Sequence, residues 1–333
     1  KVIIDGQYIG RLRGLKLDLD LKIGSLKTDI RSLRKAARQA IEPELMRRTN
    51  KIICEETLEL GDDHKIYWMG NPIARATSGK NYLNPKLELL VDEAIDPKSK
   101  WKLKKNLEEK LDKLITNELS DLVNLSKLDF KNSYVRALCY QLCENNGVIK
   151  RETIDPLIKN IPGKDRIILR KIGIKLGRYH IFLPKMLKPS AVNLRIKLWK
   201  LYFPYDEKNI IPKFGLNFLT SEKKGNRKFL LICGFENFDK FYVRVDILER
   251  LFLKIIENTK AGTFKINSDM INLVGCNKEN FFKLLESMEY KHNKSEEEYF
   301  VYQPKHKKNI QKSVVKKPNK NQLFDKLSEL RFR

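Results

Sequence analysis

Apolar and polar positions along the chain predict short strands alternating with helices. β-type residues at Val2–Ile4 and Ile66–Trp68 each precede a long helical pattern, one over Thr28–Glu56 and one from Ser99 towards Leu125. Apolar residues recur every three or four positions in both patterns, which places them on one helix face. These residues are Ile30, Leu33, Ala37, Ile41 and Leu45 in the first helix and Leu107, Leu111, Leu114, Leu119 and Leu122 in the second.

The first 130 residues contain two similar segments. Residues 6–12 (GQYIGRL) and 70–76 (GNPIARA) share three identities, and Asp5-Gly6 and Gly70-Asn71 suit hairpin turns. We therefore expect a hairpin-helix module over residues 1–60 and a second one over 61–130, with chance similarity as the alternative. Pro43 is expected to kink or split the first helix.

Residues 131–213 predict a helical module with one β-segment. Asn145-Asn146-Gly147 is typical of a left-handed helix cap. The predicted helices are 132–144, 152–159, 164–171 and 191–202, with an alternating β-type segment over 172–184.

Residues 214–303 are expected to form a winged-helix-like module. Three helical patterns are followed by two short β-type segments, which is the order of a winged helix-turn-helix. Residues 304–333 are Lys-rich and predict a flexible basic tail, with a short helix over Leu323–Phe332. The predicted fold class is α+β and mostly helical. The pattern over 244–303 consists of helices at 244–257, 268–273 and 277–288 and strands at 290–292 and 299–302.

The charge of the chain is strongly positive and unevenly distributed. The 333 residues carry a formal net charge of +25, and residues 131–213 alone hold 18 Lys and Arg against 6 Asp and Glu. Residues 61–130 are neutral overall, with 12 groups of each sign. Clustered cations release counterions from a polyphosphate, so the distribution favours nucleic-acid binding. A merely solvated basic face is the alternative.

One segment within this region is expected to contact nucleic acid. Between residues 166 and 200 there are ten Lys and Arg and no Asp or Glu, and aromatic residues are interleaved. Cations for the backbone and rings for stacking suit single-stranded nucleic acid. Gly173 and Gly177 are expected to let the backbone approach a phosphate. The candidate binding residues are Arg170, Lys171, Lys175, Arg178, Tyr179, His180, Lys185, Lys188 and Arg195.

The motifs of common enzymes are missing from this sequence. There is no phosphate-binding loop of the G-x-x-x-x-G-K-[ST] type, no H-E-x-x-H and no G-x-S-x-G. Cys139 and Cys143 share a helix face, but tetrahedral zinc needs two further ligands, so we expect both to be core residues. The sequence predicts no catalytic, cofactor or metal site in this span.

A duplex-DNA regulator is a rival interpretation of the winged-helix-like pattern. Its third helix carries Lys278 and Lys283 but also Glu279 and Glu286, and the expected wing contains Glu296–Glu298. Such a mixed surface repels phosphate, which favours a packing role for this module.

Four stretches of the chain, residues 68–75, 173–189, 243–250 and 270–276, resemble elements of bacterial superfamily 2 ATP-dependent RNA helicases similar to the mitochondrial degradasome RNA helicase. Residues 173–189 (GIKLGRYHIFLPKMLKP) resemble the G-x-x-x-G-x-Y-H-I-F-L-P-x-L-L-K-P signature that follows the motor. Residues 68–75 (WMGNPIAR), 243–250 (VRVDILER) and 270–276 (MINLVGC) resemble three further elements in the same order. The resemblance covers nearly the whole chain.

The resemblance implies an accessory, C-terminal region that guides RNA for two RecA-like motor domains. ATP and Mg²⁺ are implied for the parent protein only, because no motor motif maps onto this sequence. Lys1 begins inside a predicted strand, so we expect the motor domains upstream of it. The expected partners are single-stranded RNA or DNA, those motor domains and a ribonuclease. The alternatives are an adaptor that docks a ribonuclease or other protein, and the duplex-DNA regulator.

The expected location is the cytoplasm, without membrane contact. Five scattered cysteines do not form a disulfide framework, which favours a reducing compartment. The longest apolar stretch, near Phe229–Cys233, is far too short to span a bilayer.

Overall fold

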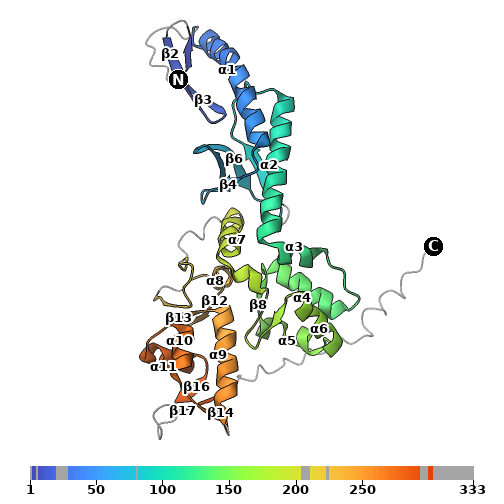
Figure 1. Cartoon of the computed structure of the whole chain (residues 1–333), viewed down its shortest axis with the longest axis vertical. Coiled ribbons are helices and arrows are strands. Elements are labelled where there is room, and N and C mark those ends of the chain that lie inside the picture. Colours follow the sequence, from blue (N-terminus) through green and yellow to red (C-terminus); the bar gives the residue numbers. More distant parts are fainter. Residues whose placement is uncertain are drawn as a thin grey trace, which may run out of the picture. The chain divides into compact units, whose positions relative to one another are not determined.

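The computed structural model has an α+β fold with about 51% helix and 22% strand. The strands form small sheets in which every pair of neighbours is antiparallel (Figure 1). The chain divides into two units, residues 1–253 with 273–275 and residues 254–272 with 276–333. The structure describes residues 2–4, 7–19, 29–79, 82–203, 211–222, 225–260, 262–292 and 299–302.

The first unit begins with a three-stranded sheet and a long helix. The apolar stripe expected on this helix is buried at Ala37, Ile41 and Leu45. The helix runs through Pro43 without a break, so the expected split does not occur. The elements are β1 (Val2–Ile4), β2 (Gln7–Arg13), β3 (Lys16–Leu19) and α1 (Asp29–Cys54).

A four-stranded sheet and a second long helix follow. Met69 and Gly70 both have positive φ and form the two-residue turn of the β5–β6 hairpin, one residue earlier than expected. β2 and β6 are equally long and begin at equivalent positions of the sequence similarity, while the tandem hairpin-helix modules stay a prediction. The elements are β4 (Glu59–Leu60), β5 (Lys65–Trp68), β6 (Asn71–Thr77), β7 (Lys86–Leu89) and α2 (Pro97–Glu118).

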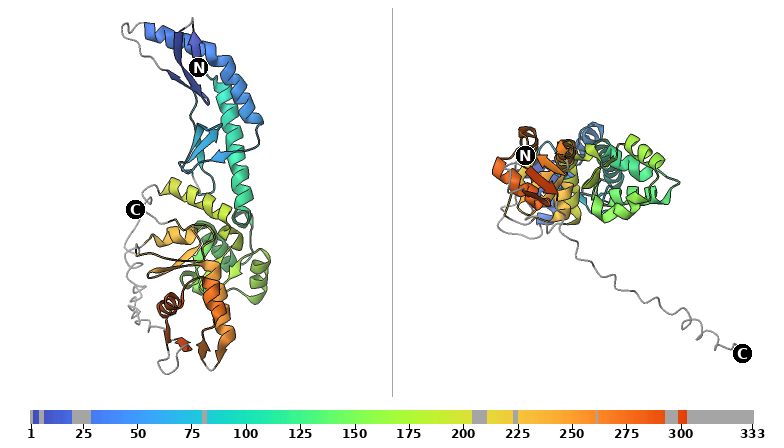
Figure 2. Two further views of the ribbon diagram at one scale, coloured as in Figure 1. Left: turned by 60° about the vertical axis from the view of Figure 1, so that its left-hand side comes forward. Right: turned by 90° about the horizontal axis from the view of Figure 1, so that it is seen from below.

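Helix α2 packs beside α1 (Figure 2). Its buried face consists of Leu103, Leu107, Leu111 and Ile115, while its amino terminus is capped by Asp96. The sequence predicts that this helix runs on towards Leu125, but α2 ends at Glu118. A separate helix, α3 (Ser120–Lys127), follows α2.

The next elements agree closely with the predicted helical module. Asn146 and Gly147 have positive φ and end the first helix in a left-handed cap, as expected. The elements are α4 (Ser133–Glu144), β8 (Val148–Lys150), α5 (Arg151–Lys159), α6 (Gly163–Lys171), β9 (Lys175–Leu176), β10 (His180–Phe182), the 3-10 helix η1 (Pro184–Leu187) and α7 (Pro189–Tyr202).

A three-stranded sheet and a short helix complete the first unit. Val192 and Trp199 of α7 share an apolar cluster with Phe229 and Phe235, so this packing crosses the boundary expected between residues 213 and 214. The elements are β11 (Phe218–Thr220), α8 (Arg227–Ile232), β12 (Phe235–Phe238), β13 (Phe241–Arg244) and α9 (Val245–Asn258), the last of which continues into the second unit.

The second unit contains most of the last two predicted helices, the predicted hairpin and two further short strands, whereas the first predicted helix, over 244–257, lies mostly in the first unit. The extra strands join the predicted hairpin in a sheet of order β14-β15-β17-β16, around the buried rings of Phe264 and Phe300. Assignment to the winged-helix class stays a prediction. The expected wing, Glu296–Glu298, and the tail lie outside the described residues. The elements are β14 (Thr259–Lys260), β15 (Thr263–Lys265), α10 (Ser268–Val274), α11 (Lys278–Ser287), β16 (Tyr290–His292) and β17 (Tyr299–Tyr302).

Candidate nucleic-acid interface

The carboxyl end of α6 places two candidate cations at the surface. Gly173 has a φ of 99°, and its N–H donates to the carbonyl of Arg170 while the N–H of Ile174 donates to that of Leu169. This pair of bonds is the Schellman motif, so Gly173 serves as a helix cap. Arg170 and Lys171 lie in the last turn, where cations interact favourably with the helix dipole.

The turn between β9 and β10 already holds an anion from the same unit. The backbone N–H groups of Arg178, Tyr179 and His180 donate to the carboxylate of Glu249 on α9, at 2.6, 2.8 and 2.8 Å. A Cβ at Gly177 would clash with the carboxylate of Glu249, so any larger residue there would displace this side chain. The expectation that this glycine turn receives a phosphate is wrong, because Glu249 occupies the position.

His180 belongs to a buried charged network and is not a surface residue. Its side chain is fully buried, and Nε2 lies 2.6 Å from Oε2 of Glu236. Arg227 donates to the other Glu236 oxygen at 2.6 Å. Burial alone would raise the pKa of Glu236, but His180 and Arg227 lower that pKa to about 2. The assignment of His180 as a nucleic-acid contact is therefore corrected.

Arg195 is also buried, and it connects three segments of the fold. Its guanidinium donates to the carbonyl oxygens of Asn146, Met186 and Ile232, each at 2.6 Å. These carbonyls lie at or beside the carboxyl ends of α4, η1 and α8, where helix dipoles are negative. Burial lowers the pKa of Arg195 to about 10. The prediction that Arg195 contacts nucleic acid is wrong, because a fully buried side chain cannot reach a ligand at the surface.

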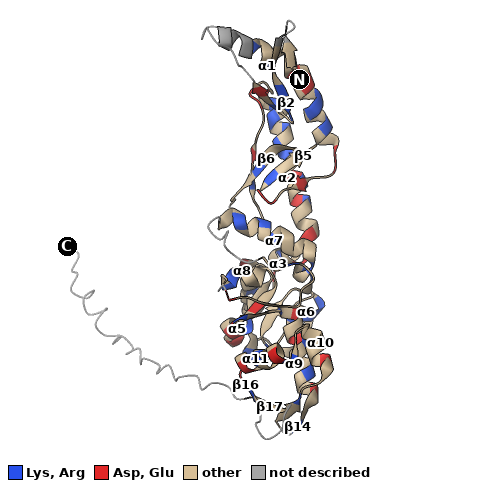
Figure 3. Cartoon of the chain, turned by 90° about the vertical axis from the view of Figure 1, so that its left-hand side faces the viewer, with Lys and Arg blue, Asp and Glu red and all other residues tan. Residues whose placement is uncertain are grey.

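Six candidate cations are exposed, and we call five of them the basic surface. Among the described residues, none of these five forms an ion pair with an acidic side chain. Figure 3 shows the Lys and Arg of α6 in blue. An exposed cation without an acidic partner can neutralise a phosphate without first breaking a salt bridge. The basic surface consists of Arg170, Lys171, Lys175, Arg178 and Lys188.

The two remaining candidates have partners within the protein. Lys185 forms an ion pair with Asp121 at 2.7 Å. The half-buried ring of Tyr179 packs edge-on against Phe252, with ring centroids 5.5 Å apart, and Arg178 lies 6.0 Å from the centre of the same ring. The ring contacts hold the β9–β10 turn against α9, and the ion pair connects η1 with α3, so neither Tyr179 nor Lys185 is counted in the basic surface.

The acidic residues that organise this region, Glu236 and Glu249, carry no signal in the sequence that indicates their role. Glu236 and Glu249 lie 56 and 69 residues after His180, so no local spacing connects them. Glu249 falls within residues 243–250, one of the stretches that carry the helicase resemblance, but that stretch alone does not indicate its partner.

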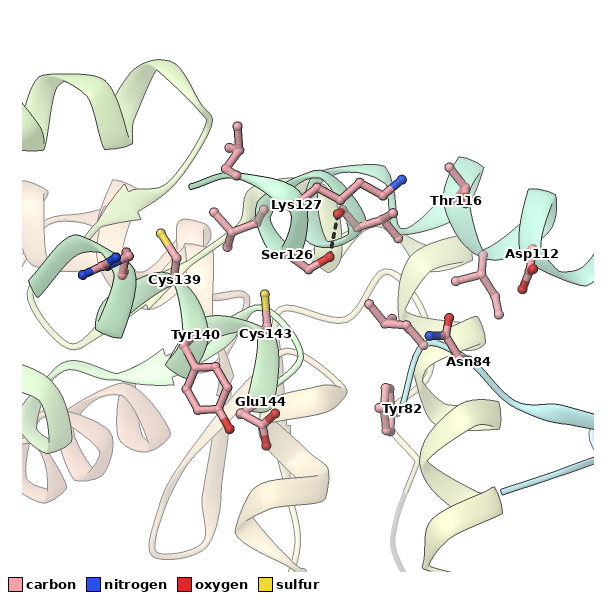
Figure 4. Close-up of a pocket in the computed structure, with 16 residues that line it drawn as sticks. Tyr82, Asn84, Asp112, Thr116, Ser126, Lys127, Cys139, Tyr140, Cys143 and Glu144 are labelled. Atoms are coloured by element: carbon pink, nitrogen blue, oxygen red, sulfur yellow. Dashed lines mark hydrogen bonds between the residues drawn. The ribbon is translucent and has the colours of Figure 1, made fainter. Parts of the chain in front are cut away.

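A separate pocket of about 750 Å³ lies among α2, α3 and α4 (Figure 4). Cys139 and Cys143 line it together with the exposed ring of Tyr140, and none of the nine candidate binding residues does. Burial raises the pKa of Cys139 to about 12 and that of Cys143 to about 11. Both thiols are therefore protonated at neutral pH and suit packing better than metal binding.

Comparison with protein families, curated proteins and solved structures finds no match to this chain. Within the described part of the chain, no three His, Cys, Asp or Glu side chains are grouped so that they could hold a metal ion. None of the described helices is long and apolar enough to cross a membrane.

Proposed function

We propose that this chain binds single-stranded RNA through the basic surface, as the C-terminal accessory region of an ATP-dependent RNA helicase. The observation that carries the proposal is the set of five exposed cations without an acidic partner among the described residues. Four of these cations lie on segments that are held by the Schellman cap at Gly173 and by the hydrogen bonds from the β9–β10 turn to Glu249.

The helicase role rests on the resemblance of residues 173–189 and of three further stretches. In this proposal the motor domains and their ATP and Mg²⁺ belong to the parent protein. This chain contributes RNA binding and contacts with the motor domains, and a ribonuclease is a further proposed partner in the cytoplasm.

Fluorescence anisotropy with a labelled 20-mer, single-stranded RNA against duplex DNA over a salt series, tests the proposal. We expect tighter binding of the single strand and a steep decrease of affinity with salt. Replacing Arg170, Lys171, Lys175 and Arg178 with Glu should abolish binding at moderate salt. If all four contact phosphates, the slope of log affinity against log salt falls by roughly 3.

A matched control carries the same change in net charge elsewhere. The control positions are exposed and lie on β3, α1, β7 and the β12–β13 turn, so replacing them with Glu should leave most of the affinity; they are Lys16, Lys35, Lys86 and Lys240. Equal losses in both variants would contradict the basic surface as the binding site. Stronger binding of duplex DNA would favour the winged-helix regulator instead.

Absence of RNA binding at low salt would favour a protein–protein adaptor. The observation in favour of that function is the pocket among α2, α3 and α4, since Leu128 and Tyr140 on its lining are exposed apolar or aromatic side chains.

A further inference from the structure

A second exposed group of cations lies on α2, within residues 61–130, and the zero net charge of this segment does not reveal it. Residues 98–105 (KSKWKLKK) contain five lysines and no acidic residue, although residues 61–130 are neutral overall. Four residues at helical spacing lie on one face of the helix, opposite the buried leucines. We call this face the lysine–tryptophan stripe; it consists of Lys98, Trp101, Lys102 and Lys105.

The indole ring of Trp101 is unusually accessible for a large aromatic side chain. Trp101 is 63% exposed, whereas the other two tryptophans, Trp68 and Trp199, are buried at 8% and 7%. Large aromatic rings are normally covered in a protein, because leaving them in water forfeits hydrophobic stabilisation. An exposed ring among cations is therefore accessible to a ligand that stacks on it.

The lysines around the Trp101 ring form only weak interactions with other side chains. The Lys105 ammonium lies 5.4 Å from the centre of the Trp101 ring and 4.0 Å from Glu109, and both interactions are at the surface. Among the described residues, Lys98 and Lys102 have no acidic partner. Surface pairs of this kind contribute about 0–1 kcal/mol, so a phosphate can replace them at little cost.

We propose that the lysine–tryptophan stripe is a second site for single-stranded nucleic acid, in which a base stacks on Trp101 and the lysines contact the flanking phosphates. Stacking needs a base released from a duplex, which selects single strands. A lipid surface fits less well, because it requires a broad apolar face, and the apolar residues of α2 are buried at Leu103, Leu107, Leu111 and Ile115. The proposal extends the RNA-binding function but does not depend on the basic surface.

Tryptophan fluorescence reports on this site directly. Since Trp68 and Trp199 are buried, we expect a 12-mer oligouridylate to quench the emission of Trp101 in a saturable manner. Trp101→Ala should weaken oligouridylate affinity by roughly tenfold, since removing one stacking platform costs about 1–3 kcal/mol. Trp101→Phe should retain most of the affinity, because a smaller ring still stacks.

A matched control comes from an aromatic residue of equal exposure. Tyr140 is also 63% exposed, but its neighbours on α4 are Arg136 and Glu144, which balance each other. Tyr140→Ala should leave the affinity unchanged. Lys98→Glu with Lys102→Glu should weaken binding at low salt and abolish the quenching.

The outcomes separate this site from the basic surface. Quenching that persists when Arg170, Lys171, Lys175 and Arg178 are replaced with Glu supports the α2 site, even if the proposal for the basic surface fails. Oligouridylate binding without quenching, unaffected by Trp101→Ala, overturns the α2 site alone. A response to anionic phosphatidylserine vesicles but not to oligouridylate would also overturn it, in favour of a membrane surface.

Discussion

At the residue scale, arginines from one basic segment have opposite roles. Arg170 is exposed without an acidic partner among the described residues, whereas Arg195 is buried and bound by three carbonyl groups. The sequence placed both in one candidate site because they share a residue type and an acid-free segment. The acceptors of Arg195 come from residues 146, 186 and 232, and no local pattern predicts that they converge.

This difference predicts which arginine stabilises the fold. Arg195→Met leaves three buried carbonyls without a donor and should lower the free energy of unfolding by about 3 kcal/mol or more. Arg170→Met removes only an exposed side chain and should change that energy by less than about 0.5 kcal/mol. Urea unfolding followed by circular dichroism measures both. Equal stability of the two variants would show that Arg195 does not hold these segments together.

At the element scale, local signals predicted most of the long helices and some of the hairpins, but not α8, the β12–β13 hairpin or the contacts between distant elements. The Asn-Asn-Gly cap after α4 was predicted and is confirmed by the positive φ of Asn146 and Gly147. β14 and β15 were missed, since strands of two or three residues are too short to show an alternating pattern. The contact of Glu249 with the β9–β10 turn depends on packing between distant elements, which the sequence alone does not reveal.

The Glu249 contact predicts the stability of that turn. Glu249→Ala removes the acceptor of three N–H groups, those of Arg178, Tyr179 and His180. Their hydrogen exchange should accelerate by at least about tenfold, because local opening no longer breaks these bonds. Exchange measured by mass spectrometry over residues 177–182 tests this. Glu257→Ala, at an exposed position on the same helix, is the control. Identical exchange in both variants would show that Glu249 does not stabilise this turn.

At the scale of the whole molecule, the net charge of long segments indicates the cationic region within residues 131–213. It does not indicate the lysines of α2, because residues 61–130 are neutral overall. The excess of Lys and Arg over residues 131–213 includes the basic surface, which consists of five of the nine predicted binding residues. The positive charge of the five lysines in residues 98–105 is cancelled in the net charge by acidic residues elsewhere in 61–130. Only exposure, with Trp101 accessible and the apolar face of α2 buried, distinguishes this segment from an ordinary charged helix.

The same view of the charge predicts how the carboxyl-terminal segment contributes to RNA binding. Residues 303–333 carry ten Lys and Arg and two Asp and Glu, so a chain ending at Tyr302 loses a net charge of +8. Its affinity for a 20-mer RNA at low salt should fall by roughly tenfold, with a smaller salt slope, because fewer counterions are released. Trp101 quenching at saturation should be unchanged. Replacing the eight lysines of this segment with Gln keeps the length and should have a similar effect. An unchanged salt slope in both variants would mean that RNA contacts only the residues before Tyr302, and the affinity would then arise from the basic surface and α2 alone.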